Sequence, residues 1–191
     1  MKIVLPLVLA GCAAIAIFPA EAATTVPARP FDTLELRGGG HVVLKHGPAQ
    51  IVRILNGSTQ YTNIHADAEE PRKLVIDTCN SDCPHQYDLD IEIVTPDMPA
   101  VAISGGGAIE SAGGFPSQHS VTAAVHGGGH IDLRSVDAAD ATAAVDGGGS
   151  ISVKAADGLT AAVNGGGKIR YWGNPRVTEA VNGGGSVSRG D

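Results

Sequence analysis

The fold is set by the stretch VHGGGHIDL, residues 125–133, which returns as VDGGGSISV at 145–153 and as VNGGGKIRY at 163–171. Each copy places three glycines between a valine and an alternating apolar segment. The triglycines begin at Gly38, Gly105, Gly127, Gly147, Gly165 and Gly183, and the last five are 22, 20, 18 and 18 residues apart. A period of this length indicates a repeat protein, in which each repeat is one structural unit.

Apolar and polar residues alternate on both sides of each triglycine. In a strand, Ile131 and Leu133 would face one side while His130 and Asp132 face the other. The segment before the glycines, for example 123–125, alternates in the same way. Glycine tolerates positive φ, so three glycines allow a sharp corner that side chains would block. Each repeat is therefore predicted to hold two short strands joined at a glycine corner.

A repeat of 18 to 22 residues cannot bury its apolar side alone, and stacking on similar repeats covers it. Stacking would align Val125, Val145 and Val163 inside the stack. The sequence therefore predicts an all-β fold for residues 31–191, a single-stranded parallel β-helix (β-solenoid) with coils of about 18–22 residues. An architecture built from hairpins is the alternative.

The beginning of the chain reads as a signal peptide, residues 1–22, followed by a linker at 23–30. Lys2 precedes an apolar stretch, and Ala20-Glu21-Ala22 forms a small-x-small cleavage site. A lipoprotein box ending at Cys12 is the alternative, which would tether the chain to a membrane by a lipid. Neither reading leaves a membrane-spanning helix. We expect the mature protein in the periplasm of a Gram-negative-type bacterium, or secreted to the cell surface.

Charge and cysteine content restrict the partners and the chemistry. The formal net charge of −7, with scattered basic residues, argues against nucleic acid and anionic lipid as partners. After removal of the signal peptide two cysteines remain, Cys79 and Cys83. In an oxidising compartment we expect them to form a disulfide. A metal site made of both cysteines and His85 is the alternative.

Polar residues flank every glycine corner, and stacking would arrange them in outward columns about 4.8 Å from rung to rung. Ser104, His126, Asp146, Asn164 and Asn182 precede the glycines, whereas Ala108, His130, Ser150, Lys168 and Ser186 follow them. We predict a binding ladder of six of these residues: His126, His130, Asp146, Asn164, Lys168 and Asn182. One alternative is a divalent metal held by His126, His130 and Asp146. The other is a solvated ladder that only stabilises the stack. No catalytic residue and no cofactor are predicted.

Several segments in the N-terminal half resemble a known family. The strand-like segments 31–36, 40–45, 73–76 and 89–96, followed by glycine-rich repeats, are similar to the head GIN domain family of auto-transporter adhesins. The resemblance covers about residues 31–188. It implies a right-handed parallel β-helix that is exported to the envelope and has no established enzymatic activity. This chain departs from the family pattern in having bare triglycine where relatives place a small polar residue in the corner.

We therefore expect an exported, non-enzymatic domain of the cell envelope, either adhesin-like and binding or structural. Its partner would be a macromolecule, a glycan or a protein. The alternative is a polysaccharide-active enzyme of the β-helix type, for which Asp132 and Arg134 are the nearest candidates and Trp172 could stack on a sugar. The last repeat, from Gly183, leaves strand edges that favour end-to-end self-association.

Overall fold

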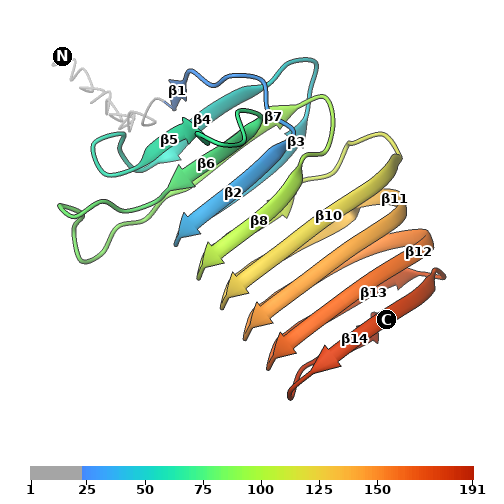
Figure 1. Ribbon diagram of the computed structural model, residues 1–191. Coiled ribbons are helices and arrows are strands. Elements are labelled where there is room, and N and C mark those ends of the chain that lie inside the picture. The colour runs from blue at the N-terminus through green and yellow to red at the C-terminus, as the bar shows by residue number, and fades with distance from the viewer. Residues whose placement is uncertain (1–22) are drawn as a thin grey trace, which may run out of the picture.

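The computed structural model of the protein describes residues 23–191. Within this range fifteen strands form one sheet (Figure 1). No helix in the described part is long and apolar enough to cross a membrane. The predicted signal peptide, residues 1–22, and the alternative lipid site at Cys12 lie outside the described residues.

The strands of the N-terminal half are short. They are β1 (Thr24–Val26), β2 (Thr33–Gly38), β3 (His41–His46), β4 (Ile51–Asn56), β5 (Asn63–Ala66), β6 (Lys73–Asp77) and β7 (Asp90–Thr95). The strands of the repeats are β8 (Ala100–Gly105), β9 (Ala108–Ser111), β10 (Gln118–Gly127), β11 (His130–Gly147), β12 (Ser150–Gly165), β13 (Lys168–Gly173), β14 (Arg176–Asn182) and β15 (Ser186–Arg189). Strand β1 lies within residues 23–30, the predicted linker, and pairs with β4.

The repeat strands pair in parallel and in a constant register. Val125 of β10 lies opposite Val145 of β11, which lies opposite Val163 of β12. Ile131, Ile151 and Ile169 form a second row in the same way. These side chains are all at most 1% exposed. The apolar rows that recur in the sequence therefore build one continuous core.

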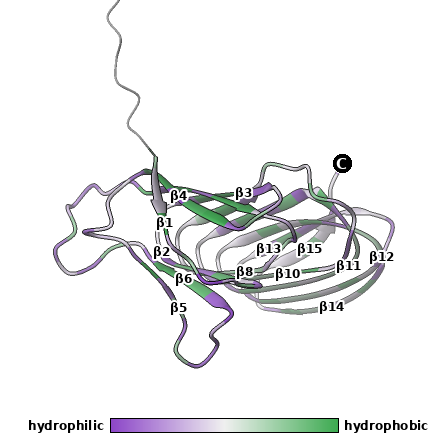
Figure 2. Ribbon diagram, turned by 90° about the horizontal axis from the view of Figure 1, so that it is seen from above, coloured by the Kyte–Doolittle hydropathy of each residue, from purple (hydrophilic) through white to green (hydrophobic). Residues whose placement is uncertain are grey.

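Long strands carry the sheet around this core. The first residues of β11 pair with β9 and its last residues with β10, and β12 likewise pairs with β13 and then with β14. Each of these strands therefore contributes to two faces. Seen from above, the sheet curves back on itself around the apolar interior (Figure 2). The result is a nearly closed, barrel-like sheet.

The predicted right-handed parallel β-helix over residues 31–191 is wrong, because the sheet is mixed. Strand β4 pairs antiparallel with β1 and with β7, and β5 pairs antiparallel with β6. The turn between β5 and β6 explains the last pair. The Asp67 carboxylate accepts hydrogen bonds from the backbone N–H groups of Glu69 and Glu70. So short a connection joins antiparallel neighbours, whereas parallel strands need a long crossover.

The connection between β6 and β7 contains the two cysteines. Cys79 and Cys83 are joined by a disulfide, with their Cα atoms 5.5 Å apart. The backbone N–H of Asn80 donates to the carbonyl of Tyr61, 3.1 Å away, which ties this loop to the segment before β5. Both sulfur atoms are therefore used in a covalent bond, and neither is a free thiolate for the alternative metal site with His85.

Candidate functional site

Direct backbone contact between glycines holds the repeats in register. Gly105, Gly127, Gly147, Gly165 and Gly183 have φ values between +107° and +134°. A Cβ atom at any of them would lie 2.5 to 2.7 Å from the carbonyl oxygen of the corresponding glycine one repeat earlier. The same carbonyl accepts hydrogen bonds, for example 3.0 Å from the Gly148 nitrogen to the Gly127 oxygen. The residues on either side of each corner are therefore aligned from repeat to repeat.

The residues before the corners form one exposed row. His126, Asp146, Asn164 and Asn182 are successive register partners on β10, β11, β12 and β14. Ser104 of β8 precedes His126 in the same row. All but Ser104 are exposed. Four of the six predicted ladder residues therefore lie side by side on one face.

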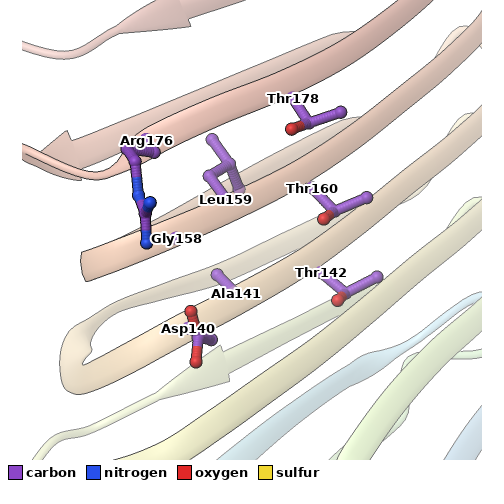
Figure 3. Close-up of a pocket in the computed structure, with 8 residues that line it drawn as sticks. All are labelled: Asp140, Ala141, Thr142, Gly158, Leu159, Thr160, Arg176 and Thr178. Atoms are coloured by element: carbon purple, nitrogen blue, oxygen red, sulfur yellow. The ribbon is translucent and has the colours of Figure 1, made fainter.

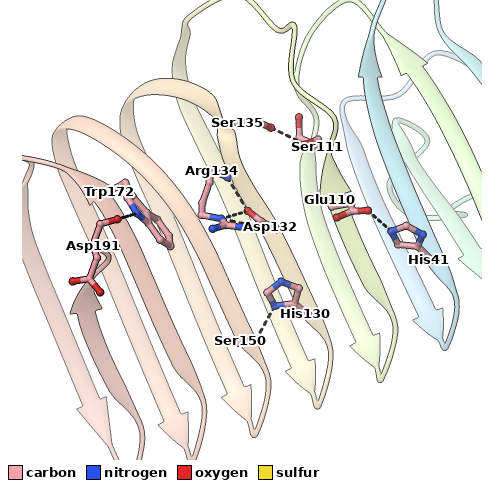
Figure 4. Close-up of polar contacts among 10 residues, drawn as sticks. All are labelled: His41, Glu110, Ser111, His130, Asp132, Arg134, Ser135, Ser150, Trp172 and Asp191. Carbon is pink, nitrogen blue, oxygen red and sulfur yellow. Dashed lines mark hydrogen bonds and ion pairs between the residues drawn. The ribbon is translucent and has the colours of Figure 1, made fainter.

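The residues after the corners form a second row on the other side of the glycines. Ala108, His130, Ser150, Lys168 and Ser186 are register partners. Nδ1 of His130 lies 2.8 Å from the Ser150 hydroxyl (Figure 4). Within residues 23–191 no hydrogen bond or ion pair joins the two rows. The predicted ladder thus divides into two separate rows, and His126 and His130 belong to different ones.

The structure gives no support to the alternative metal site. The described part of the chain contains no group of three His, Cys, Asp or Glu side chains arranged to hold an ion. Instead, two histidines that follow glycine corners, His41 and His130, each contact a side chain on a neighbouring strand. For example, Nε2 of His41 lies 2.6 Å from a carboxylate oxygen of Glu110 (Figure 4).

A hollow lies across β12 at a glycine, which has charged register partners on the strands to either side. Gly158 is the register partner of Asp140 on β11 and of Arg176 on β14. The resulting hollow has a volume of about 410 Å³. Arg176 extends toward Gly158 (Figure 3). A Cβ at position 158 would lie 2.5 Å from Oδ1 of Asp140, so glycine keeps the hollow open.

Threonine hydroxyls line one side of this hollow, and the sequence analysis missed them. Thr142, Thr160 and Thr178 are register partners, with Thr122 ahead of them in the same row. All four are exposed, and the first three appear in Figure 3 as parallel side chains. The sequence contains a signal for this row, because a threonine stands three residues before the valine that precedes each of the last four triglycines.

Asp132 and Arg134, the candidates for the alternative enzyme, form an ion pair with each other. The Arg134 Nε donates to both carboxylate oxygens of Asp132, at 2.9 and 3.0 Å (Figure 4). Burial opposes ionisation of Asp132, but these hydrogen bonds outweigh it and keep the pKa of the carboxyl below its ordinary value. The Arg134 guanidinium also lies 5.1 Å from the ring centre of Trp172, whose Nε1 donates to the carbonyl of Asp191. One side of the indole is therefore covered.

Comparisons with known proteins agree with the resemblance found in the sequence. Residues 88–175 match the family described as "Putative auto-transporter adhesin, head GIN domain", which confirms that resemblance. A crystal structure of "a putative adhesin" from Bacteroides fragilis is 15% identical, covers 90% of this chain and 98% of its own, and has a TM-score of 0.52. A "putative adhesin" from Parabacteroides distasonis is 14% identical, covers 88% and 96%, and has a TM-score of 0.44. No curated protein matches the chain. The first structure shows that the fold is shared.

Proposed function

We propose that this domain, which matches the adhesin head family over residues 88–175, is an exported, non-enzymatic and adhesin-like module. It binds a macromolecule, a glycan or a protein, through the outer face of its repeats. In this proposal residues 1–22 direct export, and residues 31–191 form the binding module in the envelope or at the cell surface.

The observation that carries the proposal is the repetition of outward side chains in register. Rows such as Thr122, Thr142, Thr160 and Thr178 offer the same group on β10, β11, β12 and β14. A ligand that itself repeats, or that presents an extended surface, can make the same contact on several rungs. Contacts that form together raise the overall affinity well above that of one contact.

The composition of the hollow at Gly158 favours binding over turnover. Glycoside hydrolysis uses two carboxyl groups, roughly 5 to 9.5 Å apart, on either side of the bond to be cleaved. Asp140 is the one carboxylate that lines this hollow, and it lies across from the guanidinium of Arg176. Threonine hydroxyls supply the remaining polar groups. Such a set orients a ligand by hydrogen bonds but lacks the second carboxylate.

The proposal includes self-association through the last repeat, but one charged residue on the edge strand opposes this association. Strands β14 and β15 each pair on one side only. Glu179 of β14 continues the inward row of Ala123, Ala143 and Ala161. An inward-pointing charge at an edge discourages pairing with another chain. We therefore expect end-to-end contacts to be weak.

The proposal is tested by measuring ligand binding and ligand integrity together. Protein spanning residues 23–191 is screened against envelope and host glycans and proteins by surface plasmon resonance, and each bound glycan is then analysed by mass spectrometry. We expect binding with no change in ligand mass. Shortened products would overturn the non-enzymatic assignment, and no binding to any ligand would overturn the adhesin-like assignment.

Two matched variants locate the binding face. Asn164→Arg places a long side chain in the exposed row on β12, whereas Asn63→Arg makes the same change at an exposed position of β5, away from the repeats. We expect Asn164→Arg to weaken binding by about tenfold or more, the loss of about one good contact, and Asn63→Arg to leave it unchanged. Equal effects of the two variants would exclude the repeat face as the binding surface.

A further inference from the structure

A second, smaller hollow lies across the beginning of β12, on the side of the glycine corners that carries His130. It has a volume of about 170 Å³ and is lined by His130, Ser150, Ile151, Ser152, Lys168 and Arg170. Ser150 lies between His130 and Lys168 in register, and Ser152 lies between Asp132 and Arg170. Two small serines are thus flanked by larger side chains on both neighbouring strands. The serines form the floor of the hollow, and Ser152 is only 8% exposed.

Two cations at this hollow lack a carboxylate partner. No carboxylate lies within 4.0 Å of Lys168 or Arg170 among residues 23–191. The nearby Asp132 is already bound by Arg134. Most other basic side chains in the described part are paired, as Lys45 is with Glu92. Arg29, Arg176 and Arg189 also lack a carboxylate partner there, but none of them lies two positions from another free cation on the same strand. In a chain with a net charge of −7, an adjacent pair of free cations stands out as a local positive site.

The polar groups around the hollow are suited to one kind of ligand. The Lys168 ammonium and the Arg170 guanidinium only donate hydrogen bonds, and a guanidinium can hold both oxygens of a carboxylate or sulfate at once. The contact between Nδ1 of His130 and the Ser150 hydroxyl, at 2.8 Å, restricts the rotation of that hydroxyl. No carboxylate lines the hollow. A neutral ligand would leave the charges unmatched, whereas an oxyanion satisfies them.

Strand β13 suggests what carries the oxyanion. Lys168, Arg170 and Trp172 alternate along this strand, so all three project outward, with about 6.6 Å between successive positions. The indole of Trp172 is in contact with the Arg134 guanidinium and with Gly190, so it is not free to stack on a sugar. The two cations carry the recognition, and their spacing along the strand fits acidic groups carried on an extended polysaccharide chain. Nucleic acid fits less well, because its charges lie about 1.7 Å apart along the duplex axis and the acidic chain as a whole repels so dense a polyanion.

We propose that this hollow binds the carboxylate or sulfate group of an acidic polysaccharide, with Arg170 and Lys168 as the charged contacts and Ser150 and Ser152 as hydroxyl donors. The proposal rests on the proposed function, since it names the ligand class of an adhesin-like module. It assigns recognition to the row that follows the glycine corners.

Calorimetric titration with a defined oligogalacturonate tests the proposal. We expect the parent protein to bind it, with an affinity that falls as salt is raised, and to bind a neutral galactose oligomer of the same length at least about tenfold more weakly. Arg170→Ala should weaken oligogalacturonate binding by about tenfold or more. Arg29→Ala removes another exposed arginine that has no carboxylate partner among the described residues and should change nothing. Unfolding midpoints equal to that of the parent show that both variants are folded.

Each contrary outcome removes a different part of the proposal. Equal affinity of Arg170→Ala and Arg29→Ala would overturn the hollow as the site. Inorganic sulfate bound as tightly as the oligosaccharide would make this a site for small anions, and an oligonucleotide bound as tightly would overturn the glycan assignment. Oligogalacturonate that does not bind, while other ligands of the screen do, ends this inference but leaves the proposed function standing. The proposed function itself fails if no ligand of the screen binds, if a glycan is cleaved, or if Asn164→Arg and Asn63→Arg affect binding equally.

Discussion

Substitution of Gly147 by alanine tests whether the glycines act as corners in backbone contact. Gly147 has a φ of +123°, and a Cβ there would lie 2.6 Å from the carbonyl oxygen of Gly127. The obstacle is backbone, so no side-chain rotation relieves it. The chain must separate two rungs at the corner or change the conformation of the corner. Either response weakens the hydrogen bonds that the Gly148 and Gly149 nitrogens donate to the Gly127 oxygen, at 3.0 and 2.9 Å.

The expected loss of stability can be summed from these contacts. A residue other than glycine in such a backbone conformation costs about 1 to 3 kcal/mol. Each weakened hydrogen bond costs about 0.5 to 1.5 kcal/mol. With two such bonds weakened, Gly147→Ala should lower the free energy of unfolding by about 2 to 6 kcal/mol. For a domain of this size each kcal/mol corresponds to a fall in Tm of about 2 to 4 °C.

The neighbouring glycine provides the control. A Cβ on Gly148 would have no atom within 4 Å, and its φ lies outside the left-handed range. Gly148→Ala should be neutral or stabilise by up to about 1 kcal/mol, because alanine reduces the entropy of the unfolded chain. Urea and thermal unfolding followed by circular dichroism measure both variants. Equal losses of stability would refute the corner model. Both variants replace a glycine by alanine, and they differ only in the φ of the replaced residue and in the atoms that its new Cβ would meet.

Three further predictions concern stability and association. The hydrogen bonds from Arg37 do most to lower the pKa of Glu35; burial opposes them, and hydrogen bonds from Lys73 and Ser104 add to them, so the pKa falls from 4.5 to about 2. Ionised Glu35 therefore adds at most about 3 kcal/mol of stability. This stability is complete above about pH 5 and is lost as the pH falls toward 2. Urea unfolding between pH 6 and pH 2 should show the parent and Glu35→Gln converging, and parallel curves would contradict this origin. The double variant Cys79→Ser/Cys83→Ser should lose at most about 2 kcal/mol of unfolding free energy, because the loop that the disulfide closes is short. Reductant should lower the unfolding midpoint of the parent by the same amount. If reductant also shifts the midpoint of the double variant, the effect has another cause. Glu179→Val removes the inward charge on β14, beside Val181, which is 43% exposed, and should produce concentration-dependent dimers in sedimentation velocity, whereas an unchanged monomer would show that other features protect this edge.

The rows inside the repeats could be predicted because they depend on a local period. The same phrase places Val125, Val145 and Val163 at equal distances from their triglycines, and parallel stacking of equal units must align them. The two outward rows follow from the same rule. For this reason the register of the predicted ladder residues agrees with the structure, although the ladder divides into two rows and its role in binding stays a proposal.

The N-terminal half could not be predicted in the same way, because alternation does not report strand direction. Strand β4 has the apolar pattern of a strand with one buried side, which is equally compatible with a parallel or an antiparallel neighbour. Its position between β1 and β7 depends on contacts across the whole sheet. The rule of the repeats holds for β2 and β3, which flank the first triglycine and pair in parallel with β8 and β9. The prediction extended the rule to β1, β4 and β5, which lie outside the repeats, and there it failed.

By itself the sequence determined the repeat, its glycine corners, its buried rows and the parallel pairing of the repeat strands, because each depends on residues within one period. Only the tertiary structure decided how the sheet closes and where ligands can sit. A hollow exists where a small residue on β12 lies between larger ones on both neighbouring strands, as Gly158 does between Asp140 and Arg176 and Ser152 does between Asp132 and Arg170. Such a shape is a property of three strands together, so no single repeat contains it.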